Sequence, residues 1–353
     1  MFTLCILISR ESYALDLSLE SYNASINSAI ETRNQWQGPL SGPTIADQKR
    51  IVFVASDLRN DGVNSVAKGM TEALKPLNWN MRLLDGHGST LRQSAAINQA
   101  IALRPDGIVL GGIDAKSNLD SLKIAKSLGI TVVGWHSANR AGAIPELNLF
   151  TNITTDAEEV GRKAAELAIV TSSAKAKVVI FTDSNYSIAM LKARSMATTI
   201  EACANCSILS LEDIPLHNIS SEMPKAIARL LKAYPDQITH FLVINDLYID
   251  FAVPTLNRYG IKTQNISAGD GSREAYQRIK SGNHQLATVP EPLFMQGWQI
   301  VDELNRAFNG LKESGFLAPV HIVVKDNIHE VDIESGVYDP KNHYRTIYQG
   351  IWQ

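Results

Sequence analysis

The 353-residue chain has little cysteine, little excess charge and no long uninterrupted hydrophobic run. Three cysteines are too few for a fold held together by disulfides. Lys and Arg total 33 against 36 Asp and Glu, so the net charge of −3 provides no basic excess for binding nucleic acid. No apolar run reaches the roughly 18–20 residues that a membrane-spanning helix requires.

The sequence also lacks the short motifs of common enzyme classes. It contains no G-x-G-x-x-G dinucleotide motif, no Walker loop and no G-x-S-x-G nucleophile turn. Its eight histidines and three cysteines show no metal-site spacing beyond one Cys-x-x-Cys pair. We therefore expect a protein without cofactor, metal or catalytic activity. A hydrolase or dehydrogenase on a similar fold is a minor alternative, which turnover of a sugar phosphate or nucleoside would revive.

What is present indicates a globular protein of two domains. Apolar residues make up 45% and charged residues 20% of the chain, which is close to the globular average. At about 150 residues per domain, this length predicts two domains.

The first 49 residues differ from the rest. An apolar run over residues 2–9 and a cleavage-like Ser12-Tyr13-Ala14 predict a short export signal at residues 1–14. A frayed apolar terminus is the alternative, because no basic residue precedes the run. Residues 15–49 form a polar extension that contains Trp36 and two Gly-Pro pairs, which break regular structure.

From residue 50 onward, apolar segments of strand length alternate with helical segments of ten or more residues. Continuous apolar strands of this kind indicate parallel sheets that are buried on both faces. The pattern predicts an α/β fold with two doubly wound parallel-sheet lobes. The clearest strands lie at 51–55, 106–110, 130–134, 177–181, 240–244 and 264–268.

In such sheets a ligand binds beyond the carboxyl ends of the strands, so the residues that follow each strand are site candidates. They are rich in planar polar groups and aromatic rings: Asp57, Arg59, Asn60, Asp114, Trp135, His136, Asp183, Tyr186, Asn245, Asp246, Asp270 and Glu291.

These side chains suit a neutral polyhydroxylated molecule. Carboxylate, amide and guanidinium groups each place two hydrogen-bonding atoms side by side, matching vicinal hydroxyls. A phosphate is a poorer match, because only Arg59 and Lys192 could neutralise one. For any single Asp or Asn, a helix cap or a turn is the competing interpretation.

The Cys203-Ala204-Asn205-Cys206 segment closes a predicted helix. In an exported protein it predicts a small disulfide loop. A redox site is the alternative, although thioredoxin-like motifs open a helix rather than close one.

A series of short motifs also occurs in a fixed order along the chain. They are 51–62, 104–108, 129–133, Asn245-Asp246, 268–271 and 287–292, followed by Gln296-Gly297. In order and spacing they resemble the type I periplasmic binding proteins of the ribose- and galactose-binding group. The resemblance covers about residues 50–330.

The resemblance implies two lobes joined by a hinge of three crossings, near 151–155, 288–291 and 319–323, with the ligand cleft between them. The first lobe would comprise 50–152 plus 291–318. The second would comprise 153–290 plus 319–353.

The resemblance also implies which residues contact the ligand. It points to Asp57, Arg59, Asn60, Asn245, Asp270 and Glu291 where the motifs match. Trp135 and His136 stand where relatives often have Asp-Arg, which removes an ion-pairing device and adds a stacking face. Lys192 best matches a ligand-binding Arg of the family, with Tyr186 as a competitor. Glu291 stands where relatives often have Gln.

The function implied is a periplasmic sugar- or polyol-binding protein that closes on its ligand and delivers it to an ABC permease. It would act as a monomer and without nucleic acid. One alternative is a receptor that docks on a sensor kinase. Another is the core of a sugar-responsive repressor, which would carry a basic helix-turn-helix in place of residues 1–50.

Overall fold

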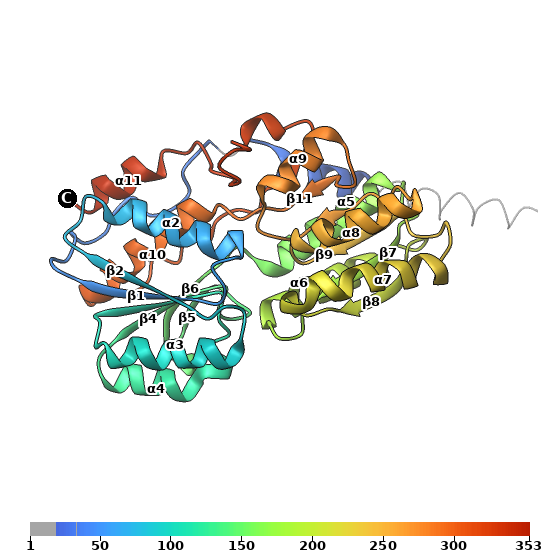
Figure 1. The fold of residues 1–353 in the computed structure, drawn as a ribbon. Coiled ribbons are helices and arrows are strands. Elements are labelled where there is room, and N and C mark those ends of the chain that lie inside the picture. Colours follow the sequence, from blue (N-terminus) through green and yellow to red (C-terminus); the bar gives the residue numbers. More distant parts are fainter. Residues whose placement is uncertain (1–18, 33) are drawn as a thin grey trace, which may run out of the picture.

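The computed structural model describes residues 19–32 and 34–353, which form two lobes lying side by side (Figure 1). The export signal predicted at residues 1–14 lies outside this range. Within it, no helix is both long and apolar enough to cross a membrane. Each lobe contains its own six-stranded sheet, so the predicted α/β fold with two lobes is confirmed.

The first sheet is apolar on both faces. Within the inner strand β1 (Arg50–Ala55), Val52 and Val54 belong to one hydrophobic cluster, while Ile51 and Phe53 belong to another. Successive side chains of a strand point to opposite faces, so helices must cover both sides of this sheet. The strand order is β2 (Asn80–Asp85), β1 (Arg50–Ala55), β3 (Gly107–Gly111), β4 (Thr131–Trp135), β6 (Leu149–Ile153) and β5 (Gly142–Ile144).

Two pairs of helices cover this sheet. On one face α2 (Asp61–Leu74) packs closely against α10 (Leu293–Phe308). Glycines allow this approach, because a Cβ on Gly297 would lie 2.5 Å from the backbone nitrogen of Met70. The other face carries α3 (Thr90–Ala102) and α4 (Leu119–Ser127).

The second lobe repeats this architecture. Its helices are α5 (Ala157–Thr171), α6 (Ser187–Glu201), α7 (Ile219–Ala233), α8 (Leu247–Tyr259) and α9 (Arg273–Ser281). Of these, α5 packs on α6 and α7 packs on α8. The strand order is β12 (Val323–Val324), β11 (Ala287–Thr288), β10 (Ile266–Ser267), β9 (His240–Val243), β7 (Lys177–Thr182) and β8 (Ser207–Asp213).

Each sheet ends in one antiparallel strand, which the purely parallel prediction missed. β5 runs antiparallel to β6, and β12 runs antiparallel to β11. Between β5 and β6 the chain reverses through a short 3-10 turn and Asn148, whose φ is +56°. A parallel return needs a crossover of a dozen or more residues, so this short connection permits only antiparallel pairing.

Three segments connect strands and helices of the two lobes, and the N-terminal extension and the C-terminal tail each cross between the lobes as well. Residues 154–156 link β6 to α5, residues 289–292 link β11 to α10, and residues 309–322 link α10 to β12. Because α10 packs against α2, this late segment of the sequence completes the first lobe.

The described part of the N-terminal extension contacts both lobes. Residues 19–30 are helical, and Ile26 and Ala29 are buried in the core of the second lobe. Further along, the ring of Trp36 lies 5.0 Å from that of Phe316 and 5.2 Å from that of Tyr348, against the first lobe. The extension therefore crosses from one lobe to the other.

The end of the chain corrects one sequence-based expectation. The resemblance places residues 319–353 in the second lobe, but α11 (Tyr344–Ile351) packs on α10 of the first. Tyr344 and Tyr348 of α11 and Trp352 just after it recur every four positions and share the first-lobe core with Trp298. Only the part of the tail around β12 joins the second sheet. The buried aromatic face explains the difference, because it has its hydrophobic partner on α10.

Cys203 and Cys206 form a disulfide with an S–S distance of 2.08 Å. It lies in the connection between α6 and β8, where Cys203 packs into the second-lobe core.

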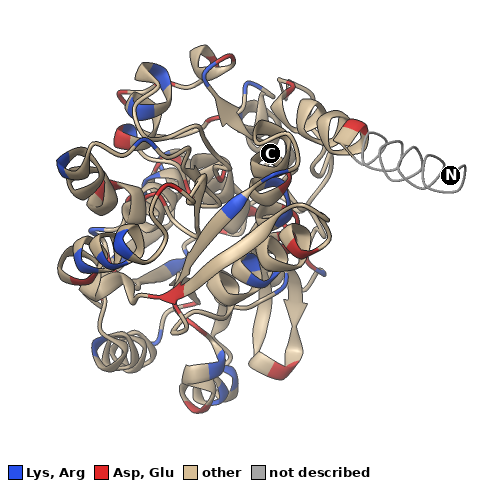
Figure 2. Ribbon diagram, turned by 90° about the vertical axis from the view of Figure 1, so that its right-hand side faces the viewer, with Lys and Arg blue, Asp and Glu red and all other residues tan. Residues whose placement is uncertain are grey.

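Charged side chains of both signs are mixed along the helices of the described chain. Figure 2 shows Lys and Arg interspersed with Asp and Glu over these helices. This mixture agrees with the small net charge of −3.

Candidate functional site

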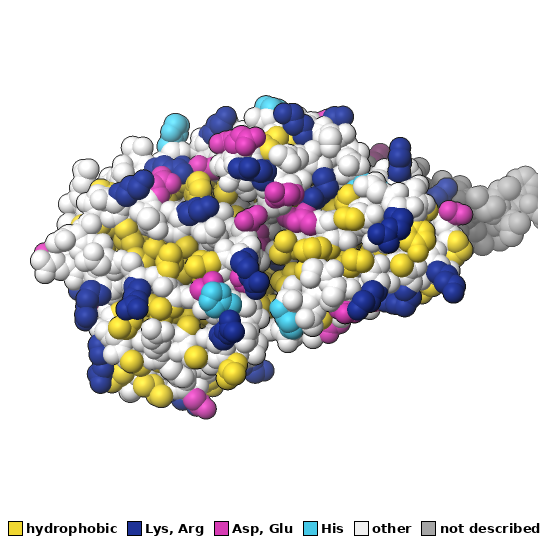
Figure 3. Space-filling view, in the orientation of Figure 1, with side chains coloured by type: hydrophobic (Ala, Val, Ile, Leu, Met, Phe, Trp, Pro, Cys, Tyr) yellow, Lys and Arg dark blue, Asp and Glu magenta, His cyan; other side chains and the backbone are white. Residues whose placement is uncertain are grey.

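A cavity of about 300 Å³ lies between the lobes, at the carboxyl ends of their strands. Both lobes line it with loop residues and with the first turns of helices. In the space-filling view, Figure 3, the seam between the lobes has hydrophobic side chains along its second-lobe side. Nine of the eleven ligand-contact candidates line the cavity: Asp57, Arg59, Asn60, Trp135, His136, Tyr186, Lys192, Asn245 and Asp270.

The loop after β1 contributes an ion pair. Arg59 donates to both carboxylate oxygens of Asp57, from Nε at 2.9 Å and from Nη2 at 2.6 Å. Partial burial opposes ionisation of Asp57, but these bonds outweigh it and lower the pKa of its carboxyl group. Asn60 is the N-cap of α2, because its side-chain oxygen accepts from the backbone nitrogens of Gly62 and Val63.

Trp135 and His136 line the cleft, but the arrangement of their rings differs from the expectation. Trp135 is only 2% exposed, donates from its indole nitrogen to Gln296 at 2.8 Å, and is stacked on His136 with ring centroids 4.0 Å apart. The imidazole thus covers one indole face. The stacking face expected of Trp135 is therefore covered on one side by His136, although the residue lines the cavity.

Glu291 lies behind His136 and does not line the cavity. It is 1% exposed, and its Oε1 lies 3.2 Å from Nε2 of His136. It also accepts from Thr155 at 2.6 Å and from Gln296 at 2.6 Å. Burial alone would raise the pKa of Glu291, but His136, the charge of Lys192 and the hydrogen bond from Thr155 lower it to about 2. Its place corrects the expectation of direct ligand contact, because its carboxylate pairs with His136 from the hinge side.

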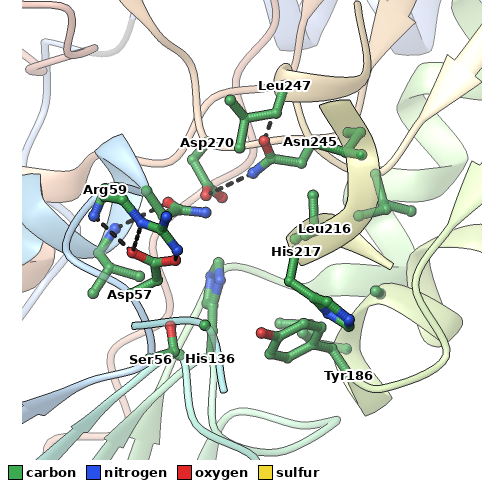
Figure 4. A pocket seen from close by; sticks show the side chains of 18 of the residues that line it. Ser56, Asp57, Arg59, His136, Tyr186, Leu216, His217, Asn245, Leu247 and Asp270 are labelled. Atoms are coloured by element: carbon green, nitrogen blue, oxygen red, sulfur yellow. Dashed lines mark hydrogen bonds and ion pairs between the residues drawn. The ribbon is translucent and has the colours of Figure 1, made fainter. Parts of the chain in front are cut away.

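The second lobe contributes a buried polar group. Asn245 donates to Asp270 at 3.2 Å, and Lys192 donates to the carbonyl of Ala268 at 2.7 Å. Burial raises the pKa of Asp270, and the charges of Lys192 and His136 oppose the rise. Figure 4 shows Asp270 between Asn245 and the pair formed by Asp57 and Arg59.

The two lobes touch around the cavity. Ser187 of α6 donates to Asp114 of the first lobe at 2.9 Å. A Cβ on Gly62 of the first lobe would lie 2.4 Å from Oδ2 of Asp270 in the second. Asp114 lies outside the cavity lining and connects the two lobes, so its predicted place as a lining residue is wrong. The contacts indicate that the cleft is closed in this structure.

Two further strand-end carboxylates have structural roles. Asp183 accepts from the backbone nitrogen of Leu216 at 2.8 Å. Asp246 accepts from Gly271, Gln285 and Thr288. For both residues, the interpretation of caps and turns fits the structure.

Ionisable groups of both signs lie in and behind the cavity in near balance. The three carboxylates of Asp57, Asp270 and Glu291 accompany Arg59, Lys192 and the two imidazoles of His136 and His217. Among the described residues, no group of three His, Cys, Asp or Glu side chains could hold a metal ion. This balance favours an uncharged ligand, because a net charge placed here would meet no opposite excess.

Sequence reasoning missed the apolar part of the lining. It selected polar and aromatic side chains that follow strands and passed over aliphatic residues a few positions later. These aliphatic residues lie in or just before the first turns of second-lobe helices, and that position is the signal that could have identified them as lining residues. They are Ile188, Ala189, Leu216, Ile219, Ile244, Leu247 and Phe251.

Solved structures of similar fold are numerous, and three of them illustrate how low the sequence identity is. A glucose-galactose binding protein from Geobacillus stearothermophilus is 19% identical, with a TM-score of 0.71, and the match covers 80% of this chain and 99% of that one. A solute binding protein of an ABC transporter from Agrobacterium vitis, bound with alpha-D-tagatopyranose, is 15% identical, with a TM-score of 0.72 and coverage of 82% and 99%. A galactofuranose binding protein is 17% identical, with a TM-score of 0.71 and coverage of 82% and 98%.

A search of curated protein sequences finds no match. The family model described as "Periplasmic binding protein domain" matches residues 51–312, which is most of both lobes. With the two-lobed fold and the cleft between the lobes, this match identifies the chain as a member of the periplasmic binding protein domain family.

Proposed function

We propose that this protein is the substrate-binding component of an ABC importer, and that it binds a monosaccharide or related polyol by cleft closure. One observation carries the proposal: polar side chains from both lobes line a single cavity between them. A ligand that contacts both lobes stabilises the closed form over the open one, and no chemical step is needed.

The cavity suits a sugar in its groups and its charge. The carboxylates of Asp57 and Asp270 accept hydrogen bonds, and Asn245 and Lys192 donate them. Hydroxyl groups can do both, so a polyol can satisfy both kinds of group at once. We assign ligand contact to Asp57, Arg59, Asn60, His136, Tyr186, Lys192, Asn245 and Asp270.

The cellular setting follows from the same proposal. The Cys203–Cys206 disulfide supports an oxidising compartment, and hence export to the periplasm. The permease would recognise the closed form of a monomer, with no nucleic acid involved. The sugars and polyols named for the similar solved structures support the ligand class.

The direct test is isothermal titration calorimetry with D-galactose, D-ribose, L-arabinose, D-tagatose, allitol and myo-inositol. We expect at least one to bind, and Asp270→Asn to weaken that binding by roughly 10–100-fold. Asp120→Asn is the matched control, because Asp120 is an exposed carboxylate on α4 whose partner is Lys123. Absence of binding across the panel, or equal affinity in both variants, would refute the proposed site.

A further inference from the structure

The lining of the cavity differs sharply between the two lobes. The first lobe contributes nine lining residues, and only Val63 among them is aliphatic. The second lobe contributes thirteen, of which seven are Ala, Ile, Leu or Phe. We call the six larger ones the apolar wall: Ile188, Leu216, Ile219, Ile244, Leu247 and Phe251.

Part of this wall lies away from the charged groups that line the cavity. In Figure 4, Asp57, Arg59 and Asp270 lie on one side and Leu216 on the other, whereas Leu247 lies beside Asn245, whose side-chain oxygen accepts from the backbone nitrogen of Leu247 at 3.0 Å. We call the first group, with His136, Asn245 and Lys192, the polar end. A ligand that fills the cavity therefore meets two chemically different surfaces.

The apolar wall faces the ligand space as well as the protein core. Ile188 is 8% exposed, yet it belongs to none of the hydrophobic clusters of the described residues. Leu216, Leu247 and Phe251 are half-buried at the edge of the second-lobe core. Their remaining apolar surface would lose contact with water when a ligand covers it, which favours an apolar ligand group.

A fully hydroxylated ligand fits this wall poorly. A hydroxyl group pressed against aliphatic side chains loses its bonds to water and gains none in return. On this side, the polar lining residues His217 and Ser220 are exposed, and Tyr186 is half-buried.

From this division we propose, on the basis of the function proposed above, that the natural ligand is amphipathic and uncharged. It has a sugar or polyol head for the polar end and a short apolar substituent for the apolar wall. A cavity of about 300 Å³ is at the small end of ligand sites, which restricts the substituent to a short alkyl chain or one aromatic ring.

The test compares D-galactose, D-glucose and D-ribose with their methyl and n-butyl ethers and glycosides, substituted at O1 or at the terminal hydroxymethyl oxygen. Calorimetry gives the affinity of each. Each buried methylene group strengthens binding by about fourfold. We therefore expect at least one n-butyl derivative to bind at least tenfold more tightly than both its methyl analogue and its parent sugar.

Variants of the apolar wall test whether the tighter binding of the n-butyl derivative depends on the proposed residues. Leu216→Asn and Leu247→Asn should each reduce the ratio of n-butyl to methyl affinity. Ile124→Asn is the control for the same chemical change, because Ile124 is an exposed apolar residue on α4, outside the cavity. Two wall variants are used so that a folding defect in one, detected by circular dichroism, does not decide the result.

The outcomes separate this inference from the proposed function. If a parent sugar binds and every n-butyl derivative binds no more tightly, the inference fails and the proposed function stands. If 1-butanol or phenol binds as well as any glycoside does, the sugar-binding function fails. If no compound binds, both fail. A gain for the n-butyl derivative that Leu216→Asn and Leu247→Asn leave unchanged also overturns the inference, because the wall is then not its cause.

Discussion

The polar end and the apolar wall border one cavity but are built by different means. At the polar end, charged groups are held by partners: Arg59 holds Asp57, Glu291 holds His136, and Asn245 contacts Asp270. Apart from Ile188, the side chains of the wall are held by packing against the second-lobe core. The polar end therefore sets ligand orientation through fixed hydrogen bonds, and the wall selects by shape and hydrophobicity.

The largest effect should follow from removing the buried carboxylate behind the polar end. Glu291→Ala leaves His136, Thr155 and Gln296 without their shared partner, so we expect a loss of about 3–5 kcal/mol in the free energy of unfolding. Leu247→Ala on the half-buried wall should cost less, about 1–2 kcal/mol. Urea denaturation measures both, and equal losses would contradict the contrast between the two surfaces.

The next largest effect should be a difference in how the stability contributions of the two surfaces depend on pH. The folded-state pKa of Glu291 is about 2, below its ordinary value of 4.5. Its contribution to stability is therefore present above pH 4.5 and is lost as the pH falls toward 2. That loss is on the order of 3 kcal/mol.

Unfolding curves at pH 6, 4.5 and 3 test this contribution. Glu291→Gln should flatten the acid dependence, whereas Leu247→Ala should shift the wild-type curve without changing its slope. If Glu291→Gln keeps the full acid dependence of the wild-type protein, Glu291 is not the group that titrates.

A smaller effect is expected where the lobes touch beside the cavity. Asp114→Ala removes the bond from Ser187 across the cleft, which contributes about 0.5–1.5 kcal/mol to closure. Ligand affinity should therefore fall by roughly two- to tenfold, which calorimetry measures. Asp120→Ala, on the exposed face of α4, should change nothing. A loss as large as that of Asp270→Asn would instead make Asp114 a direct ligand contact.

Sequence patterns predict the sheets better than the cavity. The continuous apolar run at 51–55 identifies a buried strand, because both faces of that sheet need apolar residues. The strand-end rule selects Asp57, Asn245 and Asp270, since the carboxyl ends of parallel strands meet at one edge of a sheet.

The features that the sequence does not predict depend on packing between residues that are far apart in the chain. Nothing local to Trp135 indicates that His136 covers its ring, and nothing in 340–353 indicates that α11 belongs to the first lobe. Sequence reasoning does not identify the apolar wall because Leu216 and Leu247 resemble ordinary core residues. Only the neighbouring elements reveal that they face a ligand space.

The most direct test is a crystal structure of the complex with the tightest-binding n-butyl derivative. We predict that the sugar hydroxyls lie within hydrogen-bond distance of Asp270 and Asn245. We also predict that the butyl carbons contact Leu216 and Phe251 at about 4 Å. A sugar ring lying against Leu216 with its alkyl group at Asp270, or a ligand bound outside the cleft, would contradict the division of the cavity into a polar end and an apolar wall.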